Sequence, residues 1–331
     1  MTEAVATAER NRWLTAAGWR SLFRDRPVIP LIVLLALLVF VSELVRPGVV
    51  SPGWAGVIMR TAVPLAILAG AQTLAMLTGD IDLSVGAVAS MSGFVVATLV
   101  GGQGLGVAIL VAVVAAALAG LVTGIGVGIF RVHSLIMTLG MSFIVLGLAN
   151  VWQIAMVQTG SGVPAEFRTI GSALLFDIVP YSLVVFVPIA AIILFGLRGT
   201  GYGRLLYAVG DNPIAARLSG TRPWQVLIVL YVITAVLAAI AGFLYSGLTN
   251  TASVTLVDTQ VLPSVAAAVI GGTSILGGRG GFGGSIVGAL ILTVATSLLS
   301  SLGQPEAVRQ ILFGAIIVLV AAAYTRVTSE G

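Results

Sequence analysis

RGTGYGRLLYAVGDNPIAARLSGTRPW, residues 198–224, is the longest clearly polar stretch in a chain that is otherwise almost entirely apolar. It predicts a short helix with both ends marked in the sequence. Asn212 can cap the N-terminus, and Pro213 is pre-set for the first helical position. Residues 214–219 form the body of this helix, and Gly220 suits its C-terminal stop.

The predicted helix is amphipathic. Ile214 and Leu218 lie one turn apart on one face, with Arg217 beside them. Such a short helix between membrane spans has no core of its own to bury against. Two interpretations are open: an interfacial helix that lies on lipid, or a docking helix for a soluble partner on the cytoplasmic side.

The composition predicts an all-α, polytopic membrane protein. Of 331 residues, 58% are hydrophobic and 8% are charged, whereas soluble domains carry roughly 25% charged residues. The chain has no cysteine and no lysine, and His133 is its one histidine. We therefore expect no catalytic residues, no metal site and no cofactor in this chain. Without a lysine it cannot be a conventional P-loop ATPase. The net charge of +4 is ascribed to arginines at membrane boundaries, and no nucleic-acid site is expected.

Apolar stretches predict about ten transmembrane helices in a single domain, residues 28–325, after a cytoplasmic segment 1–27 and before a cytoplasmic tail 326–331. The predicted spans are 28–45, 57–77, 83–100, 105–130, 135–157, 178–197, 224–248, 261–277, 282–302 and 308–324. The third and the eighth could instead be broken or re-entrant. Twelve of the sixteen arginines then lie inside with both termini and the 198–224 loop, in agreement with the positive-inside rule. Gly120, Gly124 and Gly128 form a small-residue stripe that favours close helix packing.

Two interruptions divide the apolar pattern. TGDIDLSVGA, residues 78–87, places Asp80 and Asp82 at the inner end of a span. These carboxylates either mark a helix start or line a pathway in an unwound half-helix. IGGTSILGGRGGFGGS, residues 270–285, is too rich in glycine for a regular helix. Interrupted helices in comparable places of two halves indicate a transport core. For gating or packing we single out Gly271, Gly272, Gly277, Gly278, Gly280 and Gly281.

Polar side chains within the spans are candidates for lining the pathway: Gln72, Asp82, Asn150, Trp152 and Gln153. Each polar one could equally join two helices by a hydrogen bond. Trp152 could equally be an interfacial anchor.

Three stretches together resemble the permease subunits of bacterial ABC sugar importers of the ribose/xylose/arabinose type. They are IDLSVGA (81–87), GRLLYAVGDNPIAARLSG (203–220) and AAAVIGGTSILGGRGGFGGSIVGALIL (266–292), and the resemblance covers residues 55–325. It implies a multi-pass subunit in a bacterial cell membrane, paired with a second copy or a paralogue. The pair would take sugar from an extracytoplasmic binding protein. A separate ATPase would use ATP-Mg and dock on Asn212, Pro213, Ile214, Ala215, Arg217 and Leu218.

The chain departs from this family pattern at two places. Residues 261–263 read Val-Leu-Pro where family members often have Glu-Leu-Asp, and Asp80 replaces a frequent glycine. Both changes bear on the substrate. Alternatives within transport are a branched-chain amino acid or a signalling-sugar derivative. An ion-coupled secondary transporter is a different class, and it would need Asp80 or Asp82 as its titratable group.

Overall fold

The computed structural model describes residues 28–156 and 162–329, so the predicted N-terminal segment 1–27 lies outside the described residues. Within them the protein is an all-helical, multi-pass membrane fold, as the composition predicted. Among the described residues, seven helices are long and apolar enough to cross a membrane. They are α3 (Val28–Val45), α4 (Pro52–Leu77), α5 (Val85–Gln103), α6 (Leu105–Gly128), α7 (Ser134–Ala155), α12 (Pro223–Thr249) and α14 (Phe282–Ser301).

An eighth candidate span is broken. Helices α9 (Leu183–Gly199) and α10 (Gly201–Asp211) pass the same test as a pair but bend by 68° where they join. The sequence predicted this span at 178–197, but the helix begins five residues later, at Leu183. Residues before it form a short hairpin of β1 (Leu174–Leu175) and β2 (Val179–Pro180). Phe176 and Asp177, with φ of 52° and 58°, make its turn.

The predicted span at 261–277 is not a full crossing. Helix α13 (Val261–Ile270) has 10 residues, which extend about 15 Å, half of a hydrocarbon core of about 30 Å. The chain then continues irregularly to α14, so the interpretation as a broken segment is confirmed. In contrast, the third predicted span, 83–100, is not broken, because it corresponds to the continuous helix α5. The last predicted span lies within α15 (Glu306–Ser329).

Helix α12 is central to the packing, because it contacts α4, α5 and α6, as well as the short helix α8 (Ala165–Ser172). The predicted glycine stripe lies against it. A Cβ atom on Gly124 would stand 2.6 Å from the Cα atom of Ile228, and one on Gly128 would stand 2.9 Å from the carbonyl oxygen of Trp224. Close approach of α6 to α12 therefore depends on these glycines.

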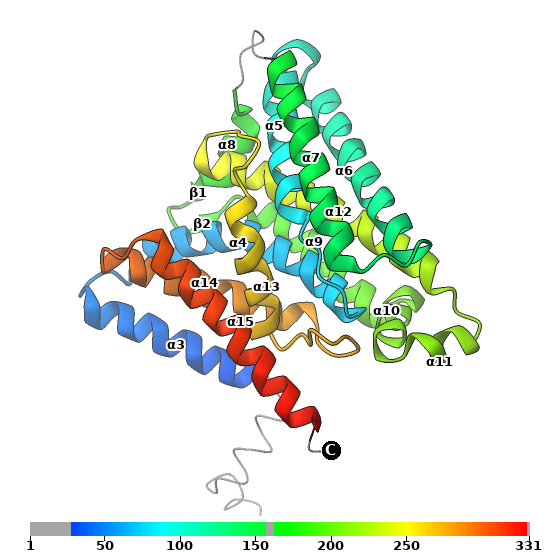
Figure 1. The fold of residues 1–331 in the computed structure, drawn as a ribbon. Helices are drawn as coiled ribbons and strands as arrows, with labels where there is room; N and C mark the ends of the chain where they lie inside the picture. The colour runs from blue at the N-terminus through cyan, green and yellow to red at the C-terminus, as the bar shows by residue number, and fades with distance from the viewer. Residues whose placement is uncertain (1–27, 157–161, 330–331) are drawn as a thin grey trace, which may run out of the picture.

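The two ends of the molecule differ (Figure 1). Helices α10 and α11 (Pro213–Leu218) lie at one end, while α8 and the β1–β2 hairpin lie at the opposite end. Between the ends, large apolar side chains are exposed on α3, α6, α7 and α9, for example Phe40, Leu110 and Ile154. Exposed apolar surface of this kind is what a lipid environment requires.

Candidate coupling site

Helix α11 has the ends that the sequence predicted. The Oδ1 atom of Asn212 accepts hydrogen bonds from the amides of Ile214 (3.0 Å) and Ala215 (2.9 Å). Pro213 occupies the first turn, and Gly220 follows the helix with φ of 86°. A side-chain cap, a proline at the start and a left-handed glycine at the end fix a helix of only six residues.

The outer face of α11 is apolar and open. The side chains of Ile214 and Leu218 are 70% and 85% exposed, and those of Asn212, Pro213, Ala215 and Arg217 are also exposed. Ala216 is buried and faces the rest of the protein. All six predicted docking residues are therefore exposed on this short segment, although Pro213 and Arg217 also line the cavity on the side that faces Asp80.

Helix α10 precedes α11 and was not recognised in the sequence. The hydroxyl of Thr200 caps it by accepting from the amide of Gly203 at 3.1 Å. Leu206 and Val209, three residues apart, are buried against the bundle. This spacing and the Thr200 cap were signals for a helix, but the glycines and arginines at the start of the stretch, residues 198–204, resembled a loop. The hydroxyl of Tyr207 donates to the carbonyl of Gly280 at 2.9 Å, so α10 also holds the glycine-rich segment.

Two motifs of the family resemblance, residues 203–220 and 266–292, meet at the end of α10. The amide of Gly278 donates to the carbonyl of Leu77 at 3.0 Å, which joins the glycine-rich segment to the last residue of α4, directly before the first interruption. Gly210 fits between them: a Cβ atom there would overlap the carbonyl oxygen of Leu77 and stand 2.8 Å from the amide nitrogen of Gly278. One on Gly277 would stand 2.8 Å from the carbonyl oxygen of Gly210. The segment that leads into α11 is therefore in backbone contact with the glycine-rich segment and with the end of α4, next to the first interruption.

Asp82 anchors the first interruption inside the bundle. Its Oδ1 atom accepts from the amide (2.9 Å) and hydroxyl (2.6 Å) of Ser84, and its Oδ2 atom accepts from the hydroxyl of Thr234 at 2.9 Å. The side-chain amide of Gln72 binds the backbone of Asp82 in both directions, donating to its carbonyl at 2.7 Å and accepting from its amide at 3.3 Å. The interruption is thereby tied to α4 and α12.

Two of the five lining candidates, Gln72 and Asp82, are thus in contact and fully buried. In this conformation they join protein segments, which was the second interpretation of these residues; their role in lining a pathway stays a prediction. The other three lie on α7. Trp152 donates to the hydroxyl of Thr98 on α5 at 3.0 Å, whereas Asn150 and Gln153 are exposed.

The α7 candidates are remote from the interruption. Thr138, near the start of α7, donates to the carbonyl of Ile81 at 3.4 Å. Asn150 lies twelve residues further along the helix, which is about 18 Å. The structure therefore does not bring Asn150, Trp152 and Gln153 together with Asp82.

The glycine-rich segment has the irregular backbone that its composition predicted. Gly272, Gly277, Gly278 and Gly280 all have positive φ, between 70° and 133°. Gly271 packs so closely against the backbone of Gly284 that a side chain at position 271 would overlap it. Gly281 is the residue immediately before α14. Close packing is therefore visible at Gly271, Gly277, Gly278 and Gly280, and gating stays a prediction.

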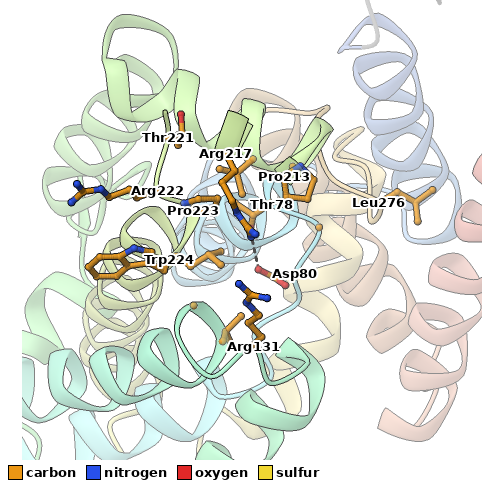
Figure 2. A pocket seen from close by; sticks show the side chains of 16 residues that line it. Thr78, Asp80, Arg131, Pro213, Arg217, Thr221, Arg222, Pro223, Trp224 and Leu276 are labelled. Carbon is orange, nitrogen blue, oxygen red and sulfur yellow. Dashed lines mark hydrogen bonds between the residues drawn. The ribbon is translucent and has the colours of Figure 1, made fainter. Parts of the chain in front are cut away.

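A cavity of about 690 Å³ separates α11 from the first interruption. Figure 2 shows the side chains of Arg131 and Arg217 pointing toward Asp80, while Arg222 points away. Burial raises the pKa of the Asp80 carboxyl, although hydrogen bonds from Ser134 and Thr78 oppose that shift. With three arginines and one carboxyl, the cavity carries a positive balance at the docking end.

The arginines follow the grouping that the positive-inside rule predicted. Arg198 and Arg279 line a neighbouring cavity with Tyr207 of α10, so they lie at the same end as the three arginines of Figure 2. Arg60, predicted on the other side, donates to the carbonyl of Ser172 at the end of α8 at 2.5 Å. Which end faces the cytoplasm stays a prediction.

Within residues 28–156 and 162–329, no three His, Cys, Asp or Glu side chains cluster as a metal site would require.

Comparisons with known proteins identify relatives over most of the chain. Residues 55–321 match the family described as the permease component of branched-chain amino acid transport systems. The ribose import permease protein RbsC of Escherichia coli K12 is 34% identical, over 95% of this chain and 96% of its own length. The fructose import permease protein FrcC of Rhizobium meliloti is 30% identical, over 89% and 84%. The autoinducer 2 import system permease protein LsrC of Escherichia coli HS is 30% identical, over 86% and 84%. No solved structure matches the chain.

Proposed function

The chain belongs to the family of permease components of branched-chain amino acid transport systems, and on that premise we propose that it is the membrane permease of an ATP-driven monosaccharide importer. The chain is a transport subunit, and it performs no covalent chemistry. The proposed cargo is a ribose-like or related sugar. Relatives named for ribose, fructose and autoinducer 2 each cover most of the chain, and they support a sugar over a branched-chain amino acid.

The observation that carries the proposal is the exposed apolar face of α11. Ile214 and Leu218 extend away from the bundle at the end of the protein where arginines collect. Burying two such side chains against a partner is worth roughly 1.5–3 kcal/mol each. We assign this face to a separate ATPase subunit, because the chain has no lysine for a Walker A loop of its own.

The geometry supports a route for the motion. ATP-Mg binding and hydrolysis in the ATPase would displace α11, and the displacement would pass through α10 to Gly210. Because Gly210 contacts Leu77 and Gly278, the same movement reaches both interrupted segments. Asp82, held by Gln72 and Thr234, would carry it into α4 and α12. If these contacts have two alternative packings, the switch between them would open the pathway first to one side of the membrane and then to the other.

The remaining partners are part of the same proposal. An extracytoplasmic sugar-binding protein would deliver the cargo at the α8 and hairpin end, and a second permease copy or a paralogue would complete the pathway. In this arrangement α11 and both termini face the cytoplasm. The grouping of Arg131, Arg198, Arg217, Arg222 and Arg279 near α11 supports that orientation.

Reconstitution tests the proposal. The permease is placed in liposomes with an ABC ATPase subunit and a sugar-binding protein from the same organism, and uptake of radiolabelled D-ribose, D-fructose and L-leucine is measured. We expect sugar uptake that requires ATP-Mg at the ATPase face, and no uptake with a proton or sodium gradient alone. Uptake by the permease alone, driven by an ion gradient, would instead support a secondary transporter. ATP-driven uptake of L-leucine without sugar uptake would support the amino-acid alternative.

A further inference from the structure

Another cavity, of about 310 Å³, lies far from α11 and carries several polar side chains on a mostly apolar wall. It opens where α4, α13, α14 and α15 converge near the end of α12, and its polar lining includes Thr61, Tyr245, Gln260, Thr293, Ser297 and Arg309. Thr61 stands sixteen residues before Leu77 on α4, a separation of about 24 Å along the helix. The cavity is therefore near the opposite end of the bundle from the ATPase-docking surface.

The hydroxyl groups of this cavity are placed to accept hydrogen bonds. Thr61 and Thr293 each donate to a carbonyl of their own helix, at 2.8 Å, so the lone pairs of both oxygens stay available. Ser297 accepts from the indole of Trp54 at 3.4 Å and keeps its own proton to donate. A polyhydroxy ligand, whose groups both donate and accept, matches this mixture.

Two further side chains add an amide and an aromatic surface. The hydroxyl of Tyr245 donates to the Oε1 atom of Gln260 at 3.3 Å, which fixes the orientation of the amide. The rings of Tyr245 and Phe313 are buried at the cavity wall. A few oriented polar groups on an otherwise apolar wall are typical of small-molecule sites.

The charges of the cavity balance. Arg309 and Glu306 form an ion pair with 3.1 Å between Nη1 and Oε2. The Nε atom of Arg309 is buried, and within the described residues it has no hydrogen-bond partner. A buried donor of this kind is stabilised when a ligand accepts from it. The balance favours a neutral solute, in contrast to the arginine-rich cavity beside α11.

We infer that this cavity binds the transported solute, a neutral polyhydroxy molecule the size of a monosaccharide. The inference rests on the proposed function and names the residues that hold the cargo. Its volume lies near the lower limit of small-molecule pockets, which are roughly 300–1,000 Å³. None of its lining residues was among the pathway candidates from the sequence, because they come from five separate helices.

The test compares two isosteric changes at buried threonines. Thr293→Val removes a hydroxyl from the cavity, and Thr123→Val removes one from α6 that also donates to its own helix, at 2.9 Å. Uptake is measured in the complete reconstituted assembly with whichever of D-ribose or D-fructose the wild type transports. We expect Thr293→Val to lower uptake at sub-saturating sugar roughly five- to tenfold, the effect of one hydrogen bond, and Thr123→Val to leave it unchanged. Equal uptake by both variants would overturn the inference.

A second measurement covers the case in which Thr293→Val fails to fold. The chain has no cysteine, so Ser297→Cys introduces a single thiol at the cavity wall. We expect D-ribose or D-fructose, whichever is transported, to slow its labelling by a water-soluble thiol reagent, with L-leucine as the control. Labelling that no transported sugar slows would contradict the inference while leaving ATP-driven uptake intact. If the wild type transports neither sugar, the proposed function itself fails.

Discussion

The backbone amide of Gly278 donates a hydrogen bond of 3.0 Å to the carbonyl of Leu77. This bond joins the glycine-rich segment to the end of α4, directly before the first interruption and about two hundred residues away in the chain. Gly210, at the end of α10, packs directly against it. The contact gives α11 a rigid connection to the two places where the helices of the bundle are broken, and the proposed transmission of motion depends on it.

A side chain at Gly210 should disrupt this contact. In Gly210→Ala the new Cβ atom would overlap the carbonyl oxygen of Leu77, which is backbone and cannot rotate away. We expect a loss of about 1–3 kcal/mol in stability, typical of overpacking. The matched control is Gly283→Ala in the first turn of α14, where no atom lies within 4 Å of the new Cβ. Thermal unfolding in detergent should show a lower midpoint for Gly210→Ala alone, and equal midpoints would refute the close packing.

The anchoring of Asp82 can be tested at Thr234. Thr234→Val keeps the shape of the side chain but removes the donor to Oδ2 of a buried carboxyl. We expect a loss of about 1–3 kcal/mol in stability, because the acceptor would be left unsatisfied. Thr123→Val is the control, since that buried hydroxyl bonds only to a carbonyl of its own helix. If thermal unfolding shows the same small change for both variants, Thr234 does not anchor the interruption.

Charge reversal tests the docking end. Arg217→Glu places a carboxylate near Asp80 and on the surface assigned to the ATPase. We expect the variant to insert normally but to lose ATPase co-purification and ATP-driven uptake. Arg168→Glu, also exposed but on α8 at the opposite end, should retain co-purification. Normal ATPase binding by Arg217→Glu would show that the partner docks elsewhere.

Local signals predicted much of the fold. The cap at Asn212 and the stop at Gly220 act over a few residues, so α11 could be placed from the sequence. The glycine stripe of α6 was likewise predicted, and it packs on α12. The family resemblance drawn from three motifs is confirmed by the match over residues 55–321 together with relatives named as ribose and fructose import permeases.

Features that depend on distant contacts could not be predicted in this way. The hydrogen bonds of Gln72 with Asp82 satisfy polar groups inside the bundle, whereas the sequence alone left a pathway lining equally open. Helix α10 was missed because its apolar residues find their partners on other helices. In contrast, the shortness of α13 follows from a local signal, the glycine-rich stretch from residue 270, which the apolar count over 261–277 did not take into account.

A cross-link from α11 tests directly whether its exposed face binds the ATPase subunit. Because the chain has no cysteine, Leu218→Cys gives a single thiol at an 85% exposed position on the docking face, and Phe176→Cys gives one at an equally exposed position on the opposite hairpin. Each variant is assembled with the ATPase and treated with a short thiol-to-amine cross-linker. We expect a covalent permease–ATPase product from Leu218→Cys and none from Phe176→Cys. A product from Phe176→Cys alone would contradict this expectation.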